Sequence, residues 1–329
     1  MAIRLGLTGD VMLGRLVDER QRRRPPAAVW GDLTAHLRKC DLLLINLECC
    51  LSTRGSPWEQ TYRPFHFRAD PQWAIPALDA ADIDVCCLAN NHVLDYGEVA
   101  LRDTLEALDE AQVQYVGAGL RRETAIEPIH ITAAGTSVAI VAFTDNTPEY
   151  AATESRPGTA HIDIDVTNEA TRETVRTALE LARRPAPDTI IASLHWGPNM
   201  VERPPDRFCD FAHWLIDEGV DVIHGHSAHI FQGIEIYKNR PILYDTGDFV
   251  DDYAVDPQAR NDRSFLFDVT LEQDGAPSSL RLHPTEISAC QAGSADGESA
   301  AWIRDRMRSL SRPFGTRFER EGEALVTSV

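Results

Sequence analysis

Short apolar runs typical of buried β-strands alternate with amphipathic segments along most of the chain, and this alternation limits the possible fold more than any other feature. In the amphipathic segments apolar residues recur at helical spacing, as Leu101, Leu105 and Leu108 do. Alternating strands and helices predict an α/β fold whose strands pair largely in parallel. The expected strands are residues 3–8, 42–46, 85–89, 138–143, 190–195, 220–224 and 242–245. The expected helices are residues 29–38, 101–108, 170–183 and 207–218.

The last third of the chain has a different pattern. Residues 265–270 and 280–283 alternate apolar and polar side chains on either side of Asp274-Gly275, which predicts a β-hairpin. Such a hairpin would be an antiparallel addition at a sheet edge. Because no Gly/Ser linker or repeat interrupts the chain before it, we expect residues 1–295 to form one domain. Residues 296–329 are expected to form a charged C-terminal tail that is helical in part.

Two proline-containing stretches, residues 53–71 and 147–157, are predicted to be long loops. Loops longer than about 12–15 residues are usually functional or disordered. Since loops on a rigid scaffold commonly carry binding residues, we expect these two stretches to determine substrate specificity.

The composition limits the class of protein and of partner. The chain has 329 residues, 43% of them hydrophobic and 25% charged, which excludes a disordered chain. Its formal net charge of −19 opposes binding to nucleic acid or anionic membranes, so a small-molecule or peptide substrate is the expected partner. The sequence leaves the oligomeric state open. No secretory signal or apolar run of roughly 20 residues is present, and the seven cysteines lack metal-ligand spacing. We therefore expect a cytoplasmic location.

Polar side chains follow the expected strands at the point where each strand ends. In open α/β sheets the carboxyl ends of the strands face one crevice, so these side chains should converge. Carboxylate and imidazole ligands together suit Mn, Zn or Fe better than Mg or Ca, and a carboxylate shared by two cations is a common way to activate a nucleophile. We therefore predict two divalent cations. The candidate ligands are Asp10, Glu48, Asn91, His195, His224, His226 and His229.

Each candidate ligand also has a simpler structural interpretation. Asp10 can cap a following helix, and Glu48 and Asn91 can be ordinary loop and turn residues. His195, at the end of an apolar run, can be a hydrogen-bonded core histidine. Three histidines within residues 224–229, flanked by glycine, are harder to explain without a metal. Because separate structural explanations for all of these strand ends are jointly improbable, we favour the metal site.

His92 directly follows one candidate ligand, so its side chain projects differently and can reach over the cations. Asp95, three residues on, can fix the tautomer of His92 and raise its basicity. We predict that His92 and Asp95 serve in general acid or base catalysis, with a cap or turn role for Asp95 as the alternative. Arg15 and Arg63 are candidate ligands for a substrate carboxylate or phosphate, and solvated surface arginine is the alternative for each.

These motifs, taken in order, resemble a known family. Gly-Asp-Val-Met-Leu-Gly-Arg from Gly9, Asn-Leu-Glu ending at Glu48, Ala-Asn-Asn-His-x-x-Asp-Tyr-Gly from Ala89, His-Trp-Gly from His195 and the late histidine cluster are similar to those of CapA-like proteins. Those proteins are named for poly-γ-glutamate capsule synthesis and belong to the calcineurin-like metallophosphoesterase superfamily. The resemblance covers about residues 3–255. It implies a four-layer α-β-β-α sandwich of the metallo-dependent phosphatase type, with a binuclear centre.

The resemblance also implies a role for each ligand. Asp10 would serve the first cation, Glu48 would bridge, and Asn91 with His195 would serve the second. The late histidines would be divided between the two cations, and His92 would be the catalytic imidazole.

Three departures from the superfamily pattern affect the expected site. The first motif is usually Asp-x-His, but Met12 stands where the histidine belongs, so the first cation is expected to bind weakly. Glu48 replaces the usual bridging Asp. The late Gly-His-x-His motif has an extra residue here. His226 and His229 are therefore favoured as ligands with His224 as the spare, and His224 with His226 is the competing pair.

Three functions follow from this interpretation. The leading hypothesis is hydrolysis of a phosphoester or of a peptide- or polyglutamate-like amide, with His92 assisting the leaving group. The second is metal-dependent epimerisation at a peptide Cα, because lasso-peptide epimerases resemble this family and a cytoplasmic location suits such tailoring. The third is a non-catalytic accessory protein that keeps a vestigial metal site.

Overall fold

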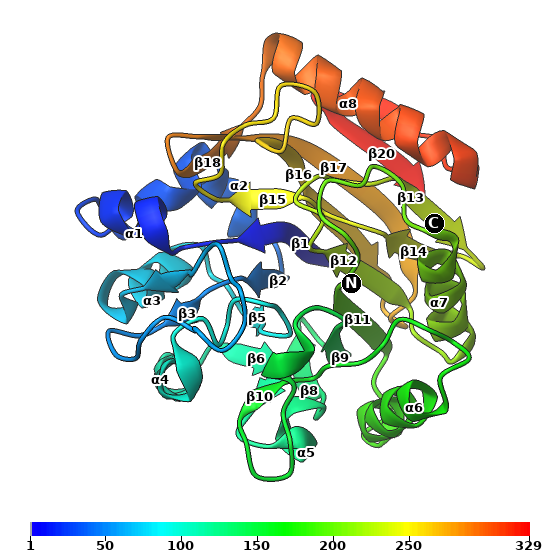
Figure 1. Ribbon diagram of the computed structural model, residues 1–329. Coiled ribbons are helices and arrows are strands. Elements are labelled where there is room, and N and C mark those ends of the chain that lie inside the picture. The colour runs from blue at the N-terminus through cyan, green and yellow to red at the C-terminus, as the bar shows by residue number, and fades with distance from the viewer. Residues whose placement is uncertain (1) are drawn as a thin grey trace.

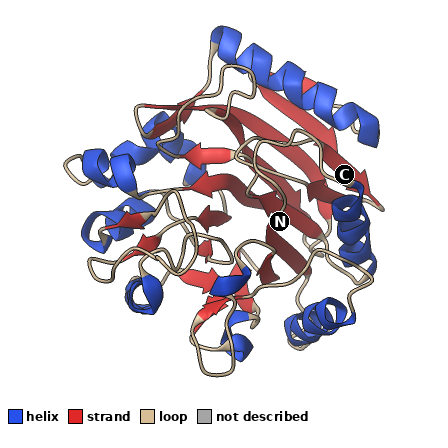
Figure 2. Ribbon diagram, viewed as in Figure 1, coloured by secondary structure: helices blue, strands red, loops and turns tan. Residues whose placement is uncertain are grey.

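Two stacked β-sheets form the centre of the computed structural model, which describes residues 2–329 (Figures 1 and 2). The strands of the first sheet, in spatial order, are β19 (Glu319–Glu321), β20 (Ala324–Ser328), β17 (Pro277–Ser288), β16 (Arg263–Leu271), β1 (Ile3–Val11), β2 (Leu42–Leu47), β5 (Val85–Cys87) and β6 (Gln114–Val116), with β15 (Asp248–Val250) beside β1 and β18 (Gln291–Ser294) beside β17. Those of the second sheet are β13 (Ile234–Tyr237), β14 (Arg240–Leu243), β12 (Val222–His226), β11 (Thr189–His195), β9 (Thr136–Thr144) and β8 (Ile129–Ala133).

The pattern along β2 shows why these strands are buried on both faces. Leu42 and Leu44 pack into the core between the two sheets, whereas Leu43, Ile45 and Leu47 pack against helices on the outer face. Successive side chains of a strand point to opposite faces, so a strand covered on both sides must be apolar at nearly every position. The same alternation occurs in β9 of the second sheet, where Ile140 faces the inner core and Val141 the outer one.

Helices cover the outer face of each sheet and complete four layers. In Figure 1, α1–α4 lie on the left against the first sheet, and α6 and α7 lie on the right against the second. The predicted α-β-β-α sandwich is therefore confirmed. The helical elements are α1 (Arg15–Gln21), η1 (Pro26–Leu33), α2 (Thr34–Leu37), α3 (Pro71–Ala80), α4 (Gly97–Glu110), α5 (Arg122–Ala125), η2 (Pro148–Tyr150), α6 (Glu169–Arg183), α7 (Asp206–Asp217), α8 (Gly297–Ser311) and η3 (Arg312–Phe314).

Two expected elements differ in detail. The segment predicted as one helix over residues 29–38 consists of part of η1 followed by α2, and Gly31, with φ +54°, interrupts the helical backbone inside η1. The strand predicted over residues 220–224 is β12 and ends two residues later, at His226. The predicted hairpin is confirmed as the antiparallel pair β16–β17, which extends the sheet beside β1.

The two predicted loops contain little regular structure. The first holds only the short strand β4 (Arg68–Ala69), which pairs with β3 (Cys50–Leu51). The second begins with η2 and leads to β10 (Gly158–Thr159), the partner of β7 (Ala118–Gly119).

Residues 296–329 form α8, η3 and the β19–β20 hairpin. α8 packs its apolar side chains into the core between the sheets, and β20 pairs with β17. In Figure 1 this helix lies across the top of the sandwich. The division of the chain at residue 295 stays a prediction. Within residues 2–329 no helix combines the length and the apolar character that crossing a membrane requires.

Leu44 tests the importance of the core between the sheets. Its side chain is fully buried there, so Leu44→Ala should lower the free energy of unfolding by about 2–5 kcal/mol. Urea denaturation followed by circular dichroism measures the change. Leu120→Ala is the matched control, because Leu120 is 47% exposed and its truncation should change stability by less than about 0.5 kcal/mol. Equal losses in both variants would contradict this description of the core.

Candidate metal centre

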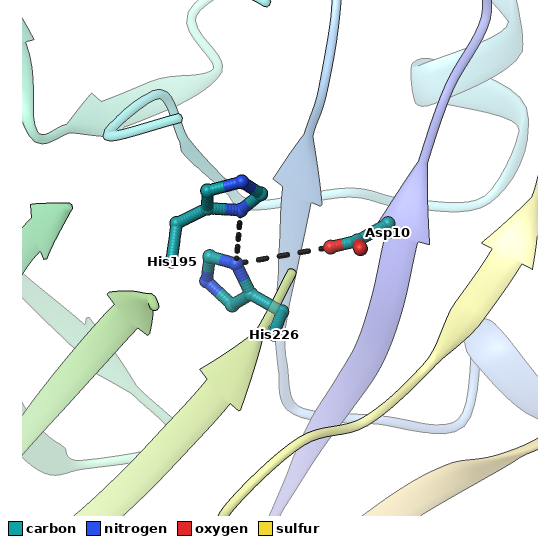
Figure 3. Close-up of side chains that lie close together, drawn as sticks. All are labelled: Asp10, His195 and His226. Atoms are coloured by element: carbon teal, nitrogen blue, oxygen red, sulfur yellow. Dashed lines mark hydrogen bonds and ion pairs between the residues drawn. The ribbon is translucent and has the colours of Figure 1, made fainter. Parts of the chain in front are cut away.

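The register of the sheets brings the predicted ligands to one place. β11 and β12 pair in parallel with His195 opposite His226, so the two imidazoles emerge side by side, with their Nδ1 atoms 3.0 Å apart. Asp10, near the end of β1 in the other sheet, faces them, and its Oδ1 lies 3.7 Å from Nδ1 of His226 (Figure 3). The centre therefore lies where the carboxyl ends of the parallel strands of both sheets meet.

The side chains form two groups with the geometry to hold metal ions. One consists of Asp10, Glu48 and His229, and the other of Asp10, His195 and His226; within each group the potential ligand atoms lie within 4.8 Å of one another. All five residues are buried. Oε1 of Glu48 is buried without a hydrogen-bond partner, which is costly unless a cation binds there. Carboxylate and imidazole donors around such an atom fit the predicted divalent cations.

Asn91 and His224, the remaining predicted ligands, occupy different positions. Oδ1 of Asn91 is 2.7 Å from Nε2 of His195, so Asn91 adjoins the second group. His224 lies outside both groups, with Nε2 2.8 Å from the carbonyl oxygen of Thr8 and Nδ1 3.1 Å from Oγ of Ser193. These positions favour His226 and His229 over the pair that includes His224, and the ligand assignment itself stays a prediction.

Burial keeps most of the imidazoles neutral, the form in which histidine binds metals. Loss of hydration lowers the pKa of His195 to about 3 and that of His226 well below its usual value. Burial and the charge of Asp10 raise the pKa of Glu48 well above its usual value. Although burial alone would lower it, the carboxylates of Asp248 and Asp10 hold the pKa of His229 far above its usual range. The carboxylates at this centre therefore favour positive charge next to them, which protonated His229 supplies and a divalent cation would also supply.

His92 and Asp95 form a hydrogen-bonded pair next to these groups. Nδ1 of His92 lies 2.6 Å from Oδ2 of Asp95, and its other nitrogen, Nε2, lies 3.7 Å from Oε1 of Glu48. Asp95 is held in place because it also accepts hydrogen bonds from the backbone N–H of Phe67 and the hydroxyl of Tyr150. The arrangement leaves Nε2 of His92 directed at the metal-binding groups.

The two predicted arginines are not solvated side chains with free guanidinium groups. Arg63 is only 12% exposed, donates to the backbone carbonyl of Asn91 and to Oγ1 of Thr147, and lies 3.7 Å from Asp95. The Arg15 guanidinium lies over the ring of Phe65, 4.5 Å from its centroid. The alternative of solvated surface arginine is therefore wrong for Arg63. Binding of substrate by either arginine stays a prediction.

A cavity of about 480 Å³ opens onto this centre. His92 and His229 line it together with Arg63, Asn91 and Tyr253. Segments of the predicted loop 53–71 form part of its wall, as expected for a loop that contacts substrate. The cavity is large enough for a small molecule or for a few residues of a peptide.

Three further residues at the centre were not predicted as site residues. Asn46 donates to Oδ1 of Asp10 at 2.7 Å and to Oε2 of Glu48 at 3.2 Å, and Asn90 in turn donates to Asn46. Oδ1 of Asp248 lies 2.8 Å from Nδ1 of His229. All three lie within the sequence motifs at the ends of the predicted strands. Nothing in those motifs indicated that Asn46 would lie between two carboxylates.

His224 allows a test of the ligand assignment that needs no substrate. Burial lowers the pKa of its imidazole to about 4, against 6.5 when it is exposed. As the pH falls below 6.5 the unfolded chain takes up a proton that the folded chain resists, so the folded state loses stability until the pH reaches about 4. Between pH 6.5 and pH 5 the lowered pKa of His224 should reduce the free energy of unfolding by about 2 kcal/mol.

We expect His224→Asn to abolish this pH-dependent loss of stability and to leave the metal content unchanged. Urea unfolding of metal-free protein at pH 7 and pH 5 measures the first effect, and elemental analysis of the metal-loaded protein measures the second. Loss of a cation from His224→Asn would instead make His224 a ligand.

Comparisons with known proteins identify the family of this chain. The family described as "Bacterial capsule synthesis protein PGA_cap" matches residues 4–253. A probable polyglutamine synthesis accessory protein of Mycobacterium tuberculosis is 35% identical, over 94% of this chain and 92% of its own. The capsule biosynthesis protein CapA of Bacillus anthracis is 29% identical, over 93% of this chain and 72% of its own.

Solved structures share the fold at much lower sequence identity. A hypothetical protein from Thermus thermophilus superposes with a TM-score of 0.51 at 16% identity, over 87% of this chain and all of that one. A putative 5'-nucleotidase from Staphylococcus aureus gives a TM-score of 0.50 at 14% identity, over 94% of this chain and 58% of that one. The predicted resemblance to CapA-like proteins is thus confirmed: the chain belongs to the PGA_cap family of bacterial capsule synthesis proteins.

Proposed function

We propose that this protein is a metal-dependent hydrolase that cleaves a phosphoester or a peptide- or polyglutamate-like amide. One observation carries the proposal. His92, held by Asp95, directs Nε2 towards Glu48 at 3.7 Å, at the edge of a cavity that opens onto the metal-binding groups. A polarising centre and a positioned acid beside it are the two parts that hydrolysis of an ester or amide needs.

The first cation would be held by Asp10, Glu48 and His229, and the second by Asp10, His195 and His226 with Asn91 beside it. When bound, the cations polarise a substrate oxygen and lower the pKa of a water molecule. Mn, Zn or Fe suits these donors best.

The remaining steps belong to the side chains around the cavity. Because Asp95 accepts a hydrogen bond at Nδ1 of His92, the protonated ring donates from Nε2 to the leaving oxygen or nitrogen. Arg63 lies on the cavity wall and adds positive charge beside an anionic substrate group. It also donates to the backbone carbonyl of Asn91, so it fixes the segment that carries His92.

Two substrate classes follow from different observations. The fold is shared with a putative 5'-nucleotidase, which supports a phosphoester. Relatives named for polyglutamine and capsule synthesis support a glutamate polymer. A small-molecule or peptide partner and a cytoplasmic location are part of the same proposal.

The test compares both classes with protein loaded with Mn²⁺. Bis-p-nitrophenyl phosphate reports phosphodiester cleavage, and gel filtration of poly-γ-glutamate reports amide cleavage. We expect turnover of at least one substrate that is lost in His195→Ala. Turnover of neither would contradict the hydrolase and favour an accessory protein, the term used for the Mycobacterium relative.

A second function, epimerisation at a peptide Cα, is supported by a separate observation. Two imidazoles line the same cavity, and each is hydrogen-bonded to a carboxylate: His92 to Asp95 and His229 to Asp248. Two such groups on either side of a carbon acid could remove and return a proton. Mass spectrometry of a glutamate-containing peptide incubated with the protein in D₂O tests this. Deuterium uptake at Cα without bond cleavage would replace the hydrolase with an epimerase.

A further inference from the structure

The first metal-binding group lacks the donor that the family resemblance places at residue 12, where this chain has Met12. Asp10, Glu48 and His229 offer three ligand atoms, the lower end of the three or four protein donors that a divalent cation with an open position for substrate usually keeps. Met12 is fully buried in the apolar core that packs against the helices of the first sheet. A thioether is a poor ligand for a hard cation, so Met12 does not supply the further donor.

Asp248 lies next to this group because of strand pairing. β15 runs parallel to β1 with Asp248 directly opposite Asp10, so the two carboxylates emerge from neighbouring strands. Oδ1 of Asp248 is 2.8 Å from Nδ1 of His229, and the same nitrogen is 3.3 Å from Oδ2 of Asp10. One nitrogen therefore lies between two fully buried carboxylates.

Three carboxylate oxygen atoms in this region lack partners. Oδ2 of Asp248 and Oε1 of Glu48 are both buried and accept no hydrogen bond, and Oδ2 of the neighbouring Asp251 is buried in the same way. Removing a carboxylate oxygen from water without a partner costs several kcal/mol, and native proteins seldom leave one so. A cation that bound both Asp248 and Glu48 would satisfy the first two of these atoms.

We propose that Asp248 is the fourth donor to the first cation and takes the place of the donor that Met12 does not supply. This inference rests on the proposed metal centre and adds a residue to it. The first group then has three carboxylates and one imidazole, whereas the second has two imidazoles. Because oxygen donors suit harder cations, the advantage of Zn²⁺ over Mn²⁺ should be smaller at the first position than at the second.

Counting bound Mn²⁺ tests the proposal without any substrate. The electron paramagnetic resonance signal of free Mn²⁺ gives the number and affinity of the bound ions in a titration. We expect two ions per wild-type chain and one in Asp248→Asn, with the affinity of the other lowered by at least about 100-fold, the upper end of what loss of an outer hydrogen-bond partner costs. The amide keeps the shape of the carboxylate, so folding should be retained.

Asp251→Asn is the matched control. Asp251 is buried on the same segment and its carboxyl adjoins Asp248, but it lies beyond the β1–β15 pairing that places Asp248 opposite Asp10 and beside His229. We expect this variant to bind both ions as the wild type does. Equal weakening in both variants would mean that the negative charge of the segment, rather than ligation by Asp248, attracts the cation, and would overturn the proposal.

A double-substitution cycle separates ligation from positioning. If Asp248 acted only by orienting His229, Asp248→Asn would change nothing once His229 is replaced by alanine. If Asp248 binds the cation itself, the substitution lowers the Mn²⁺ affinity of His229→Ala further. Two ions of unchanged affinity in Asp248→Asn would refute this inference and leave the hydrolase proposal intact. Absence of bound Mn²⁺ in the wild type would refute both.

Discussion

Replacing Asp10 with asparagine should abolish binding of both cations, the largest effect that we expect from a single substitution. Asp10 belongs to both metal-binding groups, through Oδ2 towards His229 and Oδ1 towards His226. An amide has no charge to offer and only one oxygen. We expect the metal content of the purified variant to fall from two ions per chain to nearly none, and hydrolysis to fall by more than about 100-fold. Elemental analysis and turnover measure the two effects.

Asp268→Asn is the control for loss of a buried carboxylate. Asp268 lies on β16, opposite Gly6 of β1, is 4% exposed, and pairs with Arg4 far from the metal-binding groups. This variant should lose some stability and keep both cations. If Asp10→Asn kept one ion with unchanged affinity, the two groups would not share Asp10 as described.

The pattern of apolar residues was sufficient to predict an α/β fold with buried strands because burial on two faces imposes a pattern, whereas the four layers were implied by the family resemblance. A segment such as Leu42–Leu47 is apolar at nearly every position only when a sheet is covered on both sides. The spatial order of the strands was not predictable in the same way. β15 has three residues, and its place beside β1 depends on a chain path of more than 200 residues that leaves no local signal.

The convergence of the candidate ligands was predictable where each lies at the end of a strand. His195 and His226 lie opposite each other because β11 and β12 pair in parallel, which the apolar runs implied. The conformation of the late motif was not predictable. Ser227 has φ +111° and His229 has φ +59°, values that residues other than glycine seldom adopt. This backbone conformation accommodates the extra residue and directs the side chains of His226 and His229 into different metal-binding groups.

Asp248 is a second residue whose place at the site could not be predicted from the sequence. It lies in the last strand-end motif, Tyr244-Asp245-Thr246-Gly247-Asp248. From the sequence alone, the two carboxylates of this motif are equally plausible as site residues. In the structure Asp245 accepts hydrogen bonds from the backbone N–H groups of Ala228 and Gly247, so it orders the loop instead of facing the cations. Only the pairing of Asp248 with Asp10 distinguishes the two, and that pairing is a tertiary contact.

His92→Ala should lower hydrolysis by about 10²- to 10⁴-fold and leave both cations bound. The imidazole contacts Glu48 through Nε2 at 3.7 Å but is a member of neither metal-binding group. Its loss therefore removes an acid and not a ligand. Asp95→Asn should have a smaller effect in the same direction, since the ring remains and only its hydrogen bond at Nδ1 is weakened.

Comparing substrates with different leaving groups tests whether His92 donates a proton. A proton delivered by His92 matters little when the leaving group is p-nitrophenolate, which is stable as an anion, and matters greatly for an alkoxide or an amine. The loss in His92→Ala should thus be much larger for a dialkyl phosphate, whose leaving group is an alkoxide, or for poly-γ-glutamate than for release of p-nitrophenolate from bis-p-nitrophenyl phosphate. His36→Ala, a partly buried imidazole that packs on His283 away from the cavity, should change neither rate. Equal losses for good and poor leaving groups would contradict proton donation by His92. They would mean that His92 orients Glu48 or the substrate.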